Sequence, residues 1–378
     1  MRILIATMTA GGGHLAAAAA LEEAWCALHP RDTVERIDLL KFYSPLHRKI
    51  HSEGYVKLVE RAPELWGMVF KKTDDPKVAL RLNRLQQLFP GRSRMRFVRH
   101  IKQFKPDAVI CTHYSPLEVL GEMRRKVVKS GGSPGPLCVS VVTDFEAHAL
   151  WMEAGVDLYC VAAEETKARL VARGAKAECI VATGIPIAGR FSAVTDSRGL
   201  RKAMGLRDDL TTLLVLSGGF GMGPVGKILA QLDQVQGEFQ TVVVCGRNDE
   251  LRRELAAQDR KHPTRVLGFA SNMHELMAVA DLIITKPGGL TSSEALALGK
   301  PLLILDPIPG QEAANSDFLL ERGAAAKVNR AEDLPFRVEQ LLGDKKLVEM
   351  AKAARKLGRV EAAKTICSEV VQRLAEKG

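Results

Sequence analysis

The stretch RILIATMTAGGGH, residues 2–14, joins an apolar run of strand-forming residues directly to three glycines and a histidine. A helical pattern, His14–Leu28, follows at once. Glycines let the backbone turn tightly and approach a ligand, and the helix N-terminus offers free N–H groups with a partial positive charge. The stretch therefore predicts an α/β unit with a ligand crevice at the carboxyl ends of parallel strands.

His14 ends this glycine loop, so its side chain is expected to face that crevice. A neutral imidazole there can take a proton from a hydroxyl nucleophile. Gly12 and Gly13 would let a ligand lie against bare backbone, and three glycines exceed what a turn requires. The alternative is a plain strand-to-helix turn that only caps the helix. The spacing is not the dinucleotide fingerprint, because no third spaced glycine follows.

Strand and helix patterns alternate along the rest of the chain, which predicts parallel sheets covered by helices on both faces. The predicted strands are Arg2–Thr7, Ala108–Thr112, Cys138–Thr143, Leu158–Ala162, Cys179–Ala182, Thr212–Ser217, Thr241–Cys245, Arg265–Leu267, Leu282–Thr285 and Leu302–Leu305. Helical patterns between them include Glu164–Arg173, Val225–Leu232, Asn272–Val279 and Thr291–Leu298.

These elements form two series, separated by the strand-poor connector Gly184–Leu210. The sequence predicts an N-terminal domain of residues 1–190 and a C-terminal domain of residues 191–355. The final stretch reads as a helical pattern broken only at Gly358, and its part 356–378 is expected to pack back on the first domain.

A second glycine loop, KPGGLTSSE, residues 286–294, also lies between a strand and a helix. The N–H groups and hydroxyls of its helix start suit a diphosphate, and Glu294 is placed to accept hydrogen bonds from paired ribose hydroxyls. A carboxylate in a first helical turn is also favoured by the helix dipole alone. The residues of this loop expected to contact a ligand are Gly288, Gly289, Leu290, Thr291, Ser292 and Glu294.

Other polar or glycine-rich segments follow predicted strands. Gly218 and Gly219 would let a phosphate or a sugar approach the backbone, and Arg247 would pair with phosphate or remain a solvated loop charge. Gln311 and Glu312 open a helix with donors and acceptors that suit sugar hydroxyls. Asp144 would orient His14 or contact acceptor hydroxyls, unless it only caps a helix. His148 and Trp151 would share a helical face nearby.

Charge is concentrated in one segment of the 378-residue chain. The net charge is +10, and residues 41–105 hold 16 Lys/Arg against 5 Asp/Glu, or +11. Aromatic and aliphatic residues are interspersed there, which suits an anionic membrane surface, although an amphipathic insertion that packs on its own domain is the alternative. No apolar run reaches the roughly 18 residues of a spanning helix. The chain is expected to begin at Met1 and to remain cytoplasmic, and its seven cysteines to be buried, reduced thiols.

The order of these motifs resembles the monogalactosyldiacylglycerol synthase and processive diacylglycerol glucosyltransferase family, in glycosyltransferase family 28. More distantly the chain resembles the lipid-linked N-acetylglucosaminyl transferase of peptidoglycan synthesis. The segments that carry the resemblance are Gly11–His14, Thr143–Trp151, Gly184–Pro186, Gly218–Gly221, Gly288–Glu294 and Gly310–Glu312.

The resemblance implies the GT-B fold, in which two Rossmann-like domains with parallel sheets face each other across a cleft. It implies inverting transfer of a hexose from a UDP-sugar to a lipid such as diacylglycerol, without a metal or other cofactor, giving a β-glycolipid. No D-x-D metal motif occurs. The protein would bind peripherally at the inner face of the plasma membrane through residues 41–105.

The resemblance also assigns roles to individual residues. His14 matches the proposed general base. Phe269 and Ala270 match the segment whose backbone meets the uracil. Residues 289–292 match the phosphate-binding helix start, Glu294 the ribose contact, and Gln311 with Glu312 the sugar contacts.

Three other functions are compatible with parts of this pattern. A UDP-sugar epimerase of the same fold would need no acceptor and no basic, aromatic-bearing segment. A catalytically silent nucleotide-sugar or membrane-binding protein would not need His14, Glu294, Gln311 and Glu312 intact. Nucleic-acid binding is the weakest alternative, because the basic segment contains no known binding module.

Overall fold

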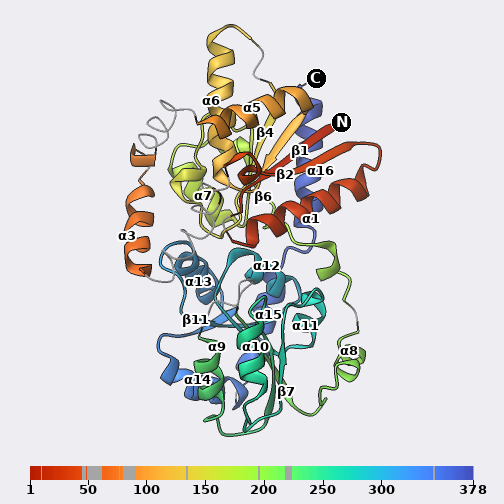
Figure 1. The fold of residues 1–378 in the computed structure, drawn as a ribbon, viewed down its shortest axis with the longest axis vertical. Helices are drawn as coiled ribbons and strands as arrows, with labels where there is room; N and C mark the ends of the chain where they lie inside the picture. Colours follow the sequence, from red (N-terminus) through yellow and green to blue (C-terminus); the bar gives the residue numbers. More distant parts are fainter. Residues whose placement is uncertain are drawn as a thin grey trace. The chain divides into compact units, whose positions relative to one another are not determined.

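The computed structural model describes residues 1–9, 11–44, 48, 62–75, 77–79, 91–132, 135–194, 196–217, 224–343 and 345–377. These residues form two α/β units, shown in Figure 1. The first comprises Met1–Gly189, Pro309–Gln311 and Glu361–Gly378, and the second comprises Arg190–Ile308 with Glu312–Val360.

The first unit is built on a six-stranded parallel sheet with the order β2-β1-β3-β4-β5-β6. β1 pairs with β2 on one side and with β3 on the other, so the chain reverses its direction of travel across the sheet at β1. A ligand crevice is expected at this switch point, beyond the carboxyl ends of β1 and β3. The strands are β1 (Arg2–Thr7), β2 (Thr33–Asp38), β3 (Ala108–Cys111), β4 (Leu137–Val141), β5 (Leu158–Val161) and β6 (Ile180–Ala182).

Helices cover both faces of this sheet, because its central strands are apolar on both sides. Every residue of β3, β4 and β5 is buried. The C-terminal helix packs beside α1 on one face, where Ile366 and Val370 join the core around Trp25 (Figure 1). The helices are α1 (Gly13–Leu28), α3 (Pro63–Thr73), α5 (Arg92–Phe104), α6 (Tyr114–Lys129), α7 (Glu164–Ala172) and α16 (Ala362–Lys377), with short 3₁₀ turns at Leu39–Phe42, Ala149–Trp151 and Ala177–Cys179.

The second unit also contains a six-stranded parallel sheet, with the order β12-β11-β10-β7-β8-β9. β7 pairs with both β8 and β10, which places the switch point between β7 and β10. This is the strand order of a Rossmann fold. The strands are β7 (Thr211–Leu216), β8 (Phe239–Val244), β9 (Thr264–Leu267), β10 (Leu282–Thr285), β11 (Leu302–Leu305) and β12 (Ala325–Val328).

The helices of the second unit pack through apolar residues at helical spacing. In α9, for example, Val225, Ile228, Leu229 and Leu232 are all buried. The helices are α8 (Ser197–Ala203), α9 (Val225–Leu232), α10 (Asp249–Ala256), α11 (Met273–Val279), α12 (Gly289–Ala297), α13 (Gln311–Glu321), α14 (Leu334–Gly343) and α15 (Lys346–Leu357), with short 3₁₀ turns at Gly189–Phe191 and Ala331–Asp333.

Gly358 interrupts the C-terminal helical pattern, as the sequence predicts, and separates α15 from α16. A Cβ at this position would lie 2.5 Å from the carbonyl oxygen of Leu296 in α12. The close approach of the two helices therefore requires glycine, and the chain leaves α15 here to enter the first unit.

The ten predicted strands all occur, with ends shifted by no more than two residues, but two further strands are present. β2 and β12 lie at the edges of the two sheets. β2 has the sequence TVERID and only one fully buried residue, and β12 is only four residues long. β2 is half-exposed and lacks the continuous apolar run of a central strand, whereas β12 is mostly buried but its sequence AAKV is interrupted by Lys327.

The cysteines are all free, but the expectation that they are buried is wrong for two of them. Cys26 is exposed on α1 and Cys179 is partly exposed, whereas the other five are buried. Among the described residues, no helix is both long enough and apolar enough to cross a membrane.

Candidate active site

His14 lies at the start of α1, beside the carboxyl end of β3. Its Nδ1 lies 2.9 Å from the carbonyl oxygen of Thr112 and 2.9 Å from the hydroxyl of Thr143. A carbonyl oxygen only accepts, so Nδ1–H donates to Thr112 and the neutral ring keeps its lone pair on Nε2. The Thr112 hydroxyl in turn donates to the His14 carbonyl oxygen at 3.0 Å. This tautomer is the one that a general base needs.

The surroundings of His14 favour the neutral imidazole. The ring is packed edge-on against His113, with centroids 4.8 Å apart, and Trp151 lies beyond it at 6.5 Å. Although the residue keeps some surface exposure, the desolvation of its ring lowers its pKa below the usual value. The charge of Asp144 acts in the opposite direction and raises that pKa. At neutral pH His14 therefore carries no charge, and Asp144 is near enough to stabilise the imidazolium once it forms.

A cavity of about 340 Å³ lies in the first unit, with His14 and Asp144 in its wall. The wall combines an apolar surface with a small number of polar groups, which is typical of ligand sites. The apolar and aromatic residues are Met8, Leu39, Tyr43, Trp66, Phe70, Tyr114, Val119, Leu150 and Trp151. The polar ones are Thr9, His14, Thr73, Arg94, His113, Ser115, Glu118, Asp144, Glu146, His148 and Gln311.

Glu118 is a cavity residue that the sequence reasoning missed. It lies in α6 and is only 7% exposed. Burial raises its pKa to about 7, against the opposing charge of Arg94. The available signal was a glutamate between the apolar residues Leu117 and Val119, in the helix that follows β3. Such a carboxylate on a buried helix face requires a partner or a function.

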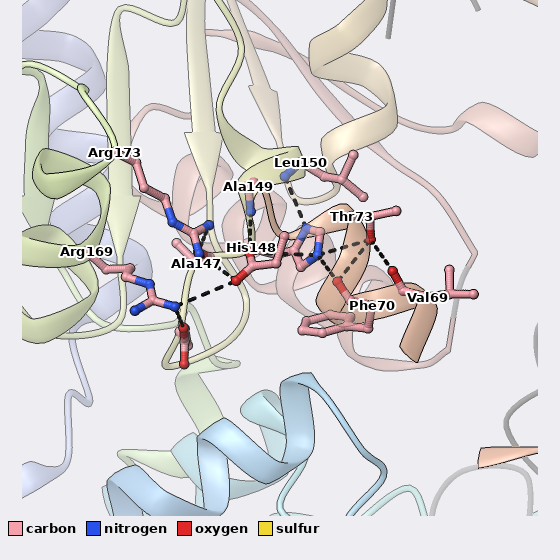
Figure 2. Close-up of polar contacts among 11 residues, drawn as sticks. Val69, Phe70, Thr73, Ala147, His148, Ala149, Leu150, Arg169 and Arg173 are labelled. Atoms are coloured by element: carbon pink, nitrogen blue, oxygen red, sulfur yellow. Dashed lines mark hydrogen bonds and ion pairs between the residues drawn. The ribbon is translucent and has the colours of Figure 1, made fainter. Parts of the chain in front are cut away.

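The end of α3 is fastened to residues 147–150 by a polar cluster around His148 (Figure 2). Nε2–H of His148 donates to the carbonyl oxygen of Phe70 at 3.0 Å, and its Nδ1 accepts from the Leu150 N–H at 3.1 Å. Asp74 accepts from the Ala149 N–H at 2.9 Å and from the Arg173 guanidinium at 2.6 Å. Arg173 also donates to the carbonyl oxygen of Ala147 at 2.9 Å.

This cluster, Asp74, His148 and Arg173, is called the α3 latch below. It joins three segments that are far apart in the sequence, and it holds the helix that supplies Trp66, Phe70 and Thr73 to the cavity wall. Hydrogen bonds from the Arg173 guanidinium and the Ala149 N–H, together with the positive charge of Arg173, keep the pKa of Asp74 below its usual value despite its partial burial. The wall of the cavity therefore depends on ion pairing as well as on apolar packing.

Two histidines act as helix caps. His113 caps α6 by accepting from the Ser115 N–H at 3.1 Å. His148 caps the 3₁₀ turn Ala149–Trp151 rather than lying within an α-helix, and both His148 and Trp151 line the cavity. His148, and not Asp144, caps this turn. The carboxylate of Asp144 lies in the cavity wall.

In the second unit, α12 begins at the switch point beyond β10. Its N-cap is Gly288, so no side chain caps the helix and the first-turn N–H groups have no intrahelical partner. The hydroxyl of Ser292 is fully buried and, within the described part of the chain, has no hydrogen-bond partner. Asn315 donates to the carbonyl oxygen of Pro287 at 3.0 Å and fixes the loop. This helix start, formed by residues 288–292, can receive an anionic group.

Glu294 lies in the second turn of α12, because the helix begins at Gly289 rather than Thr291. The explanation that a first-turn carboxylate merely complements the dipole therefore does not apply. Burial raises the pKa of Glu294 to about 8, although the charge of Arg190 opposes the shift. In the protein without ligand its carboxyl group is largely protonated at neutral pH.

Arg247 and Phe269 follow β8 and β9 and lie together. The guanidinium carbon of Arg247 is 5.6 Å from the centroid of the Phe269 ring, within cation–π range. Phe269 is 66% exposed, which is unusual for a large aromatic side chain. Ala270, the next residue, is partly exposed.

The remaining predicted ligand contacts lie in two segments, Gly218 with Gly219 and Gln311 with Glu312. Gly218 and Gly219 lie outside the described residues, although the preceding Ser217 donates to the Val244 carbonyl oxygen at 2.8 Å. Gln311 and Glu312 open α13, but one carboxylate oxygen of Glu312 already accepts from the Ile308 N–H at 2.8 Å. Among the described residues no group of three His, Cys, Asp or Glu side chains is arranged to hold a metal ion.

Two family descriptions match consecutive parts of the chain. Residues 14–187 match monogalactosyldiacylglycerol (MGDG) synthase, and residues 215–368 match the glycosyltransferase family 28 C-terminal domain. The chain is 31% identical over 374 residues to a processive diacylglycerol beta-glucosyltransferase of Bacillus pumilus, covering 98% of this chain and 94% of that protein. It is 32% identical over 376 residues to a protein of the same name from Bacillus cereus, covering 98% and 93%.

Solved structures confirm the predicted GT-B fold. Acinetobacter baumannii MurG has a TM-score of 0.63 at 17% identity, covering 98% of this chain and 99% of that chain. Anabaena HepE in complex with UDP has a TM-score of 0.58 at 15% identity, covering 99% and 100%. A UDP-GlcNAc 2-epimerase of Neisseria meningitidis bound to UDP-GlcNAc scores 0.60 at 14% identity, covering 98% and 100%. Because a UDP-GlcNAc 2-epimerase also has this fold, the fold alone does not identify the reaction.

The relatives at 31–32% identity do identify the reaction as glycosyl transfer, because the alignment with them extends through both units. Both the resemblance to this family and the prediction of a hexosyltransferase are confirmed. The chain belongs to the diacylglycerol glycosyltransferases of glycosyltransferase family 28, the family that contains the processive diacylglycerol beta-glucosyltransferases of Bacillus.

Proposed function

We propose that this protein transfers a hexose from a UDP-sugar to the hydroxyl of diacylglycerol with inversion, and that His14 is the general base. The acceptor oxygen bonds to the anomeric carbon while its proton passes to Nε2 of His14. The bond from the anomeric carbon to the UDP oxygen breaks, and UDP leaves with the electron pair. The observation that carries this proposal is the Nδ1–H bond from His14 to Thr112, which holds Nε2 as the basic nitrogen.

Asp144 has an electrostatic role in this reaction. Its carboxylate raises the pKa of His14 against the effect of burial, so the imidazolium gains stability as the proton arrives. The apolar surface of the same cavity suits the glycerol and upper acyl region of a lipid. The first unit, residues 1–190 with the C-terminal helix, is thus assigned to the acceptor, and residues 191–355 to the donor.

The donor proposal places the UDP diphosphate at the start of α12. The unpaired N–H groups of Gly289, Leu290 and Thr291, together with the helix dipole, would stabilise the negative charge on departing UDP. We assign this role to the helix rather than to a metal ion. The buried Ser292 hydroxyl would add a hydrogen bond. Anabaena HepE, a protein with this fold, was crystallised in complex with UDP, which supports a UDP site in this fold.

The other donor contacts are assigned from the positions of the residues after the strands of the second sheet. Arg247 and Phe269 form a cation–aromatic pair beyond β8 and β9, and we assign to Phe269 and Ala270 the contact with uracil. Gln311 and Glu312 would bind the hexose hydroxyls. The glycines 218 and 219 keep their predicted role near the phosphates.

Glu294 provides a test of the ribose contact. Ribose hydroxyls donate to a carboxylate and lower its pKa, which lies at about 8 without ligand. UDP binding at pH 7 should therefore release up to about one proton, and UDP affinity should rise as pH increases from 6 to 8. Calorimetry in buffers of different ionisation enthalpy measures this release. Glu294→Gln should abolish it and weaken UDP binding by about tenfold or more. Equal proton release by wild type and variant would refute the ribose assignment.

The proposal places the protein peripherally at an anionic membrane, on its cytoplasmic side, through residues 41–105. In the described part of this segment, α3 exposes Leu65 and Met68, at 51% and 70%, next to Lys71 and Lys72. α5 buries Phe97 and Ile101 and exposes arginines, including Arg96. Apolar residues beside cations suit the headgroup region of a membrane.

Substitution of both Leu65 and Met68 by aspartate should weaken binding to phosphatidylglycerol vesicles by about tenfold or more, since each inserted side chain contributes roughly 1.5–3 kcal/mol. Val128→Asp is a matched control, because Val128 is 58% exposed but lies on α6. Vesicle co-sedimentation at several salt concentrations gives the measurement. Equal losses of vesicle binding in the double variant and in Val128→Asp would show that α3 does not contact the membrane.

The activity itself is tested by transfer of radiolabel from UDP-glucose, UDP-galactose or UDP-N-acetylglucosamine into lipid. Vesicles of phosphatidylglycerol containing diacylglycerol supply the acceptor. Label in the organic phase supports the proposal and identifies the hexose. Label that stays in water as an isomerised UDP-sugar would support the epimerase alternative instead, and bound but unchanged donor would indicate a binding protein.

A further inference from the structure

The strongest unexplained feature is the carboxyl group of Glu118 in the wall of the cavity that contains His14. Glu118 is more than nine-tenths buried, yet it borders the cavity. The pKa of this carboxyl is shifted by burial and by the charges of Arg94 and Glu153, and no hydrogen bond from a described residue contributes to the shift. A buried carboxyl without a hydrogen-bonding partner costs free energy, so its retention points to a ligand that supplies the partner.

The neighbours of Glu118 suit a polyol. Tyr43 and Arg94 also line the cavity, and each interacts electrostatically with the Glu118 carboxyl. Arg94 is held by Glu122 at 3.3 Å, one turn along the same face of α6. A carboxyl, a phenol and a guanidinium together offer both donors and acceptors, as sugar hydroxyls require.

Aromatic rings complete this environment. Trp66, Tyr114 and Trp151 all contribute to the cavity wall, and the rings of Tyr114 and Trp151 are perpendicular with centroids 6.3 Å apart. Their apolar faces can cover the C–H surface of a sugar ring while the polar set binds its hydroxyls.

Diacylglycerol alone does not account for this polar set. It has one free hydroxyl, which the proposed reaction places at His14. A lipid that already bears a sugar brings several more hydroxyls to the same cavity. The relatives described above are named as processive, which means that their products also serve as acceptors.

Resting on the proposed function, we infer that Glu118 is a specificity-determining residue that binds hydroxyls of the sugar on a glycosylated diacylglycerol acceptor. Glu118 thereby favours the second transfer over the first. Tyr43 and Arg94 support the same sugar, and His14 remains the base for both transfers.

The test compares kcat/KM for two acceptors, diacylglycerol and monoglucosyl diacylglycerol, in identical phosphatidylglycerol vesicles. Glu118→Leu should lower the value for the glycosylated acceptor at least about tenfold more than the value for diacylglycerol, because the sugar loses its buried partner. Glu118→Gln retains a donor and an acceptor and should recover most of the difference. Glu164→Leu, at an exposed position of α7 and outside the cavity wall, is the control and should leave the ratio of the two values unchanged.

A measurement on the wild-type protein guards against misfolding of the variants. Trp66 and Trp151 line the cavity, so their fluorescence should respond to octyl glucoside at lower concentration than to octanol. Equal responses would overturn the inference. Equal loss on both lipid acceptors in Glu118→Leu would also overturn it, while the proposed function would stand. Absence of any lipid product from wild-type protein would instead count against the proposed function itself.

Discussion

Replacement of His14 by alanine should reduce hexose transfer by about a hundredfold to ten-thousandfold, the usual range for a general base. UDP affinity should stay near the wild-type value, since the proposed UDP contacts all lie in the second unit. His14→Gln is the sharper variant, because its amide can still donate to Thr112 but cannot take up a proton. Steady-state transfer and calorimetric UDP binding measure the two quantities separately. A strong loss of UDP binding in either variant would contradict the assignment of His14 as base.

The pH dependence of transfer provides a second check on His14. A base must be neutral to act, so activity should rise with pH through the pKa of His14, which burial holds below 6.5. Asp144→Asn removes the charge that raises this pKa, and the acidic limb of the profile should move to lower pH. A shift towards higher pH would show that another group controls the limb.

Replacement of Arg173 by leucine should produce the largest effect away from His14, because it breaks the α3 latch. Asp74 loses its 2.6 Å partner, and the carbonyl oxygen of Ala147 loses its donor. The Arg173 side chain is 9% exposed but that of Asp74 is 22% exposed, so solvent screens part of the loss. We expect a destabilisation of roughly 2 kcal/mol and a similar loss of binding to the lipid acceptor.

The two effects of Arg173→Leu are separable. KM for diacylglycerol should rise by about tenfold or more, because α3 carries part of the cavity wall, whereas UDP affinity should not change. The double variant Asp74→Asn with Arg173→Leu should cost less than the sum of the single changes, as expected for partners in one cluster. Lys167→Leu, at a partly exposed position of α7, serves as a control. An unchanged KM for diacylglycerol in Arg173→Leu would show that the α3 latch has no part in acceptor binding.

The central strands were predictable from the sequence because burial on both faces demands continuous apolar residues. β10 and β11 begin and end at the predicted residues. The edge strand β2 was not predictable in this way, since a half-exposed strand tolerates polar residues such as those of TVERID, and β12 has the sequence AAKV, with only two apolar residues before Lys327. The loops that follow the central strands could therefore be located, and with them His14, Asp144 and the start of α12.

The side-chain contacts of the site were harder to predict from the sequence. The spacing of residues does not reveal that Nδ1 of His14 donates to Thr112, or that Arg173 binds Asp74 across 99 positions. The caps formed by His113 and His148 depend on backbone turns that propensity leaves open. Glu118 was missed because the apolar pattern of α6 does not distinguish a residue that faces a cavity from one that faces the core.

The anomeric configuration of the lipid product tests the central claim most directly. Wild-type protein, vesicles with diacylglycerol, and the UDP-α-hexose that supports transfer would yield enough glycolipid for proton NMR. The account predicts a β-linked hexose on diacylglycerol, because His14 activates the acceptor for attack opposite UDP. An α-linked product would contradict the single inverting displacement, and with it the role assigned to His14.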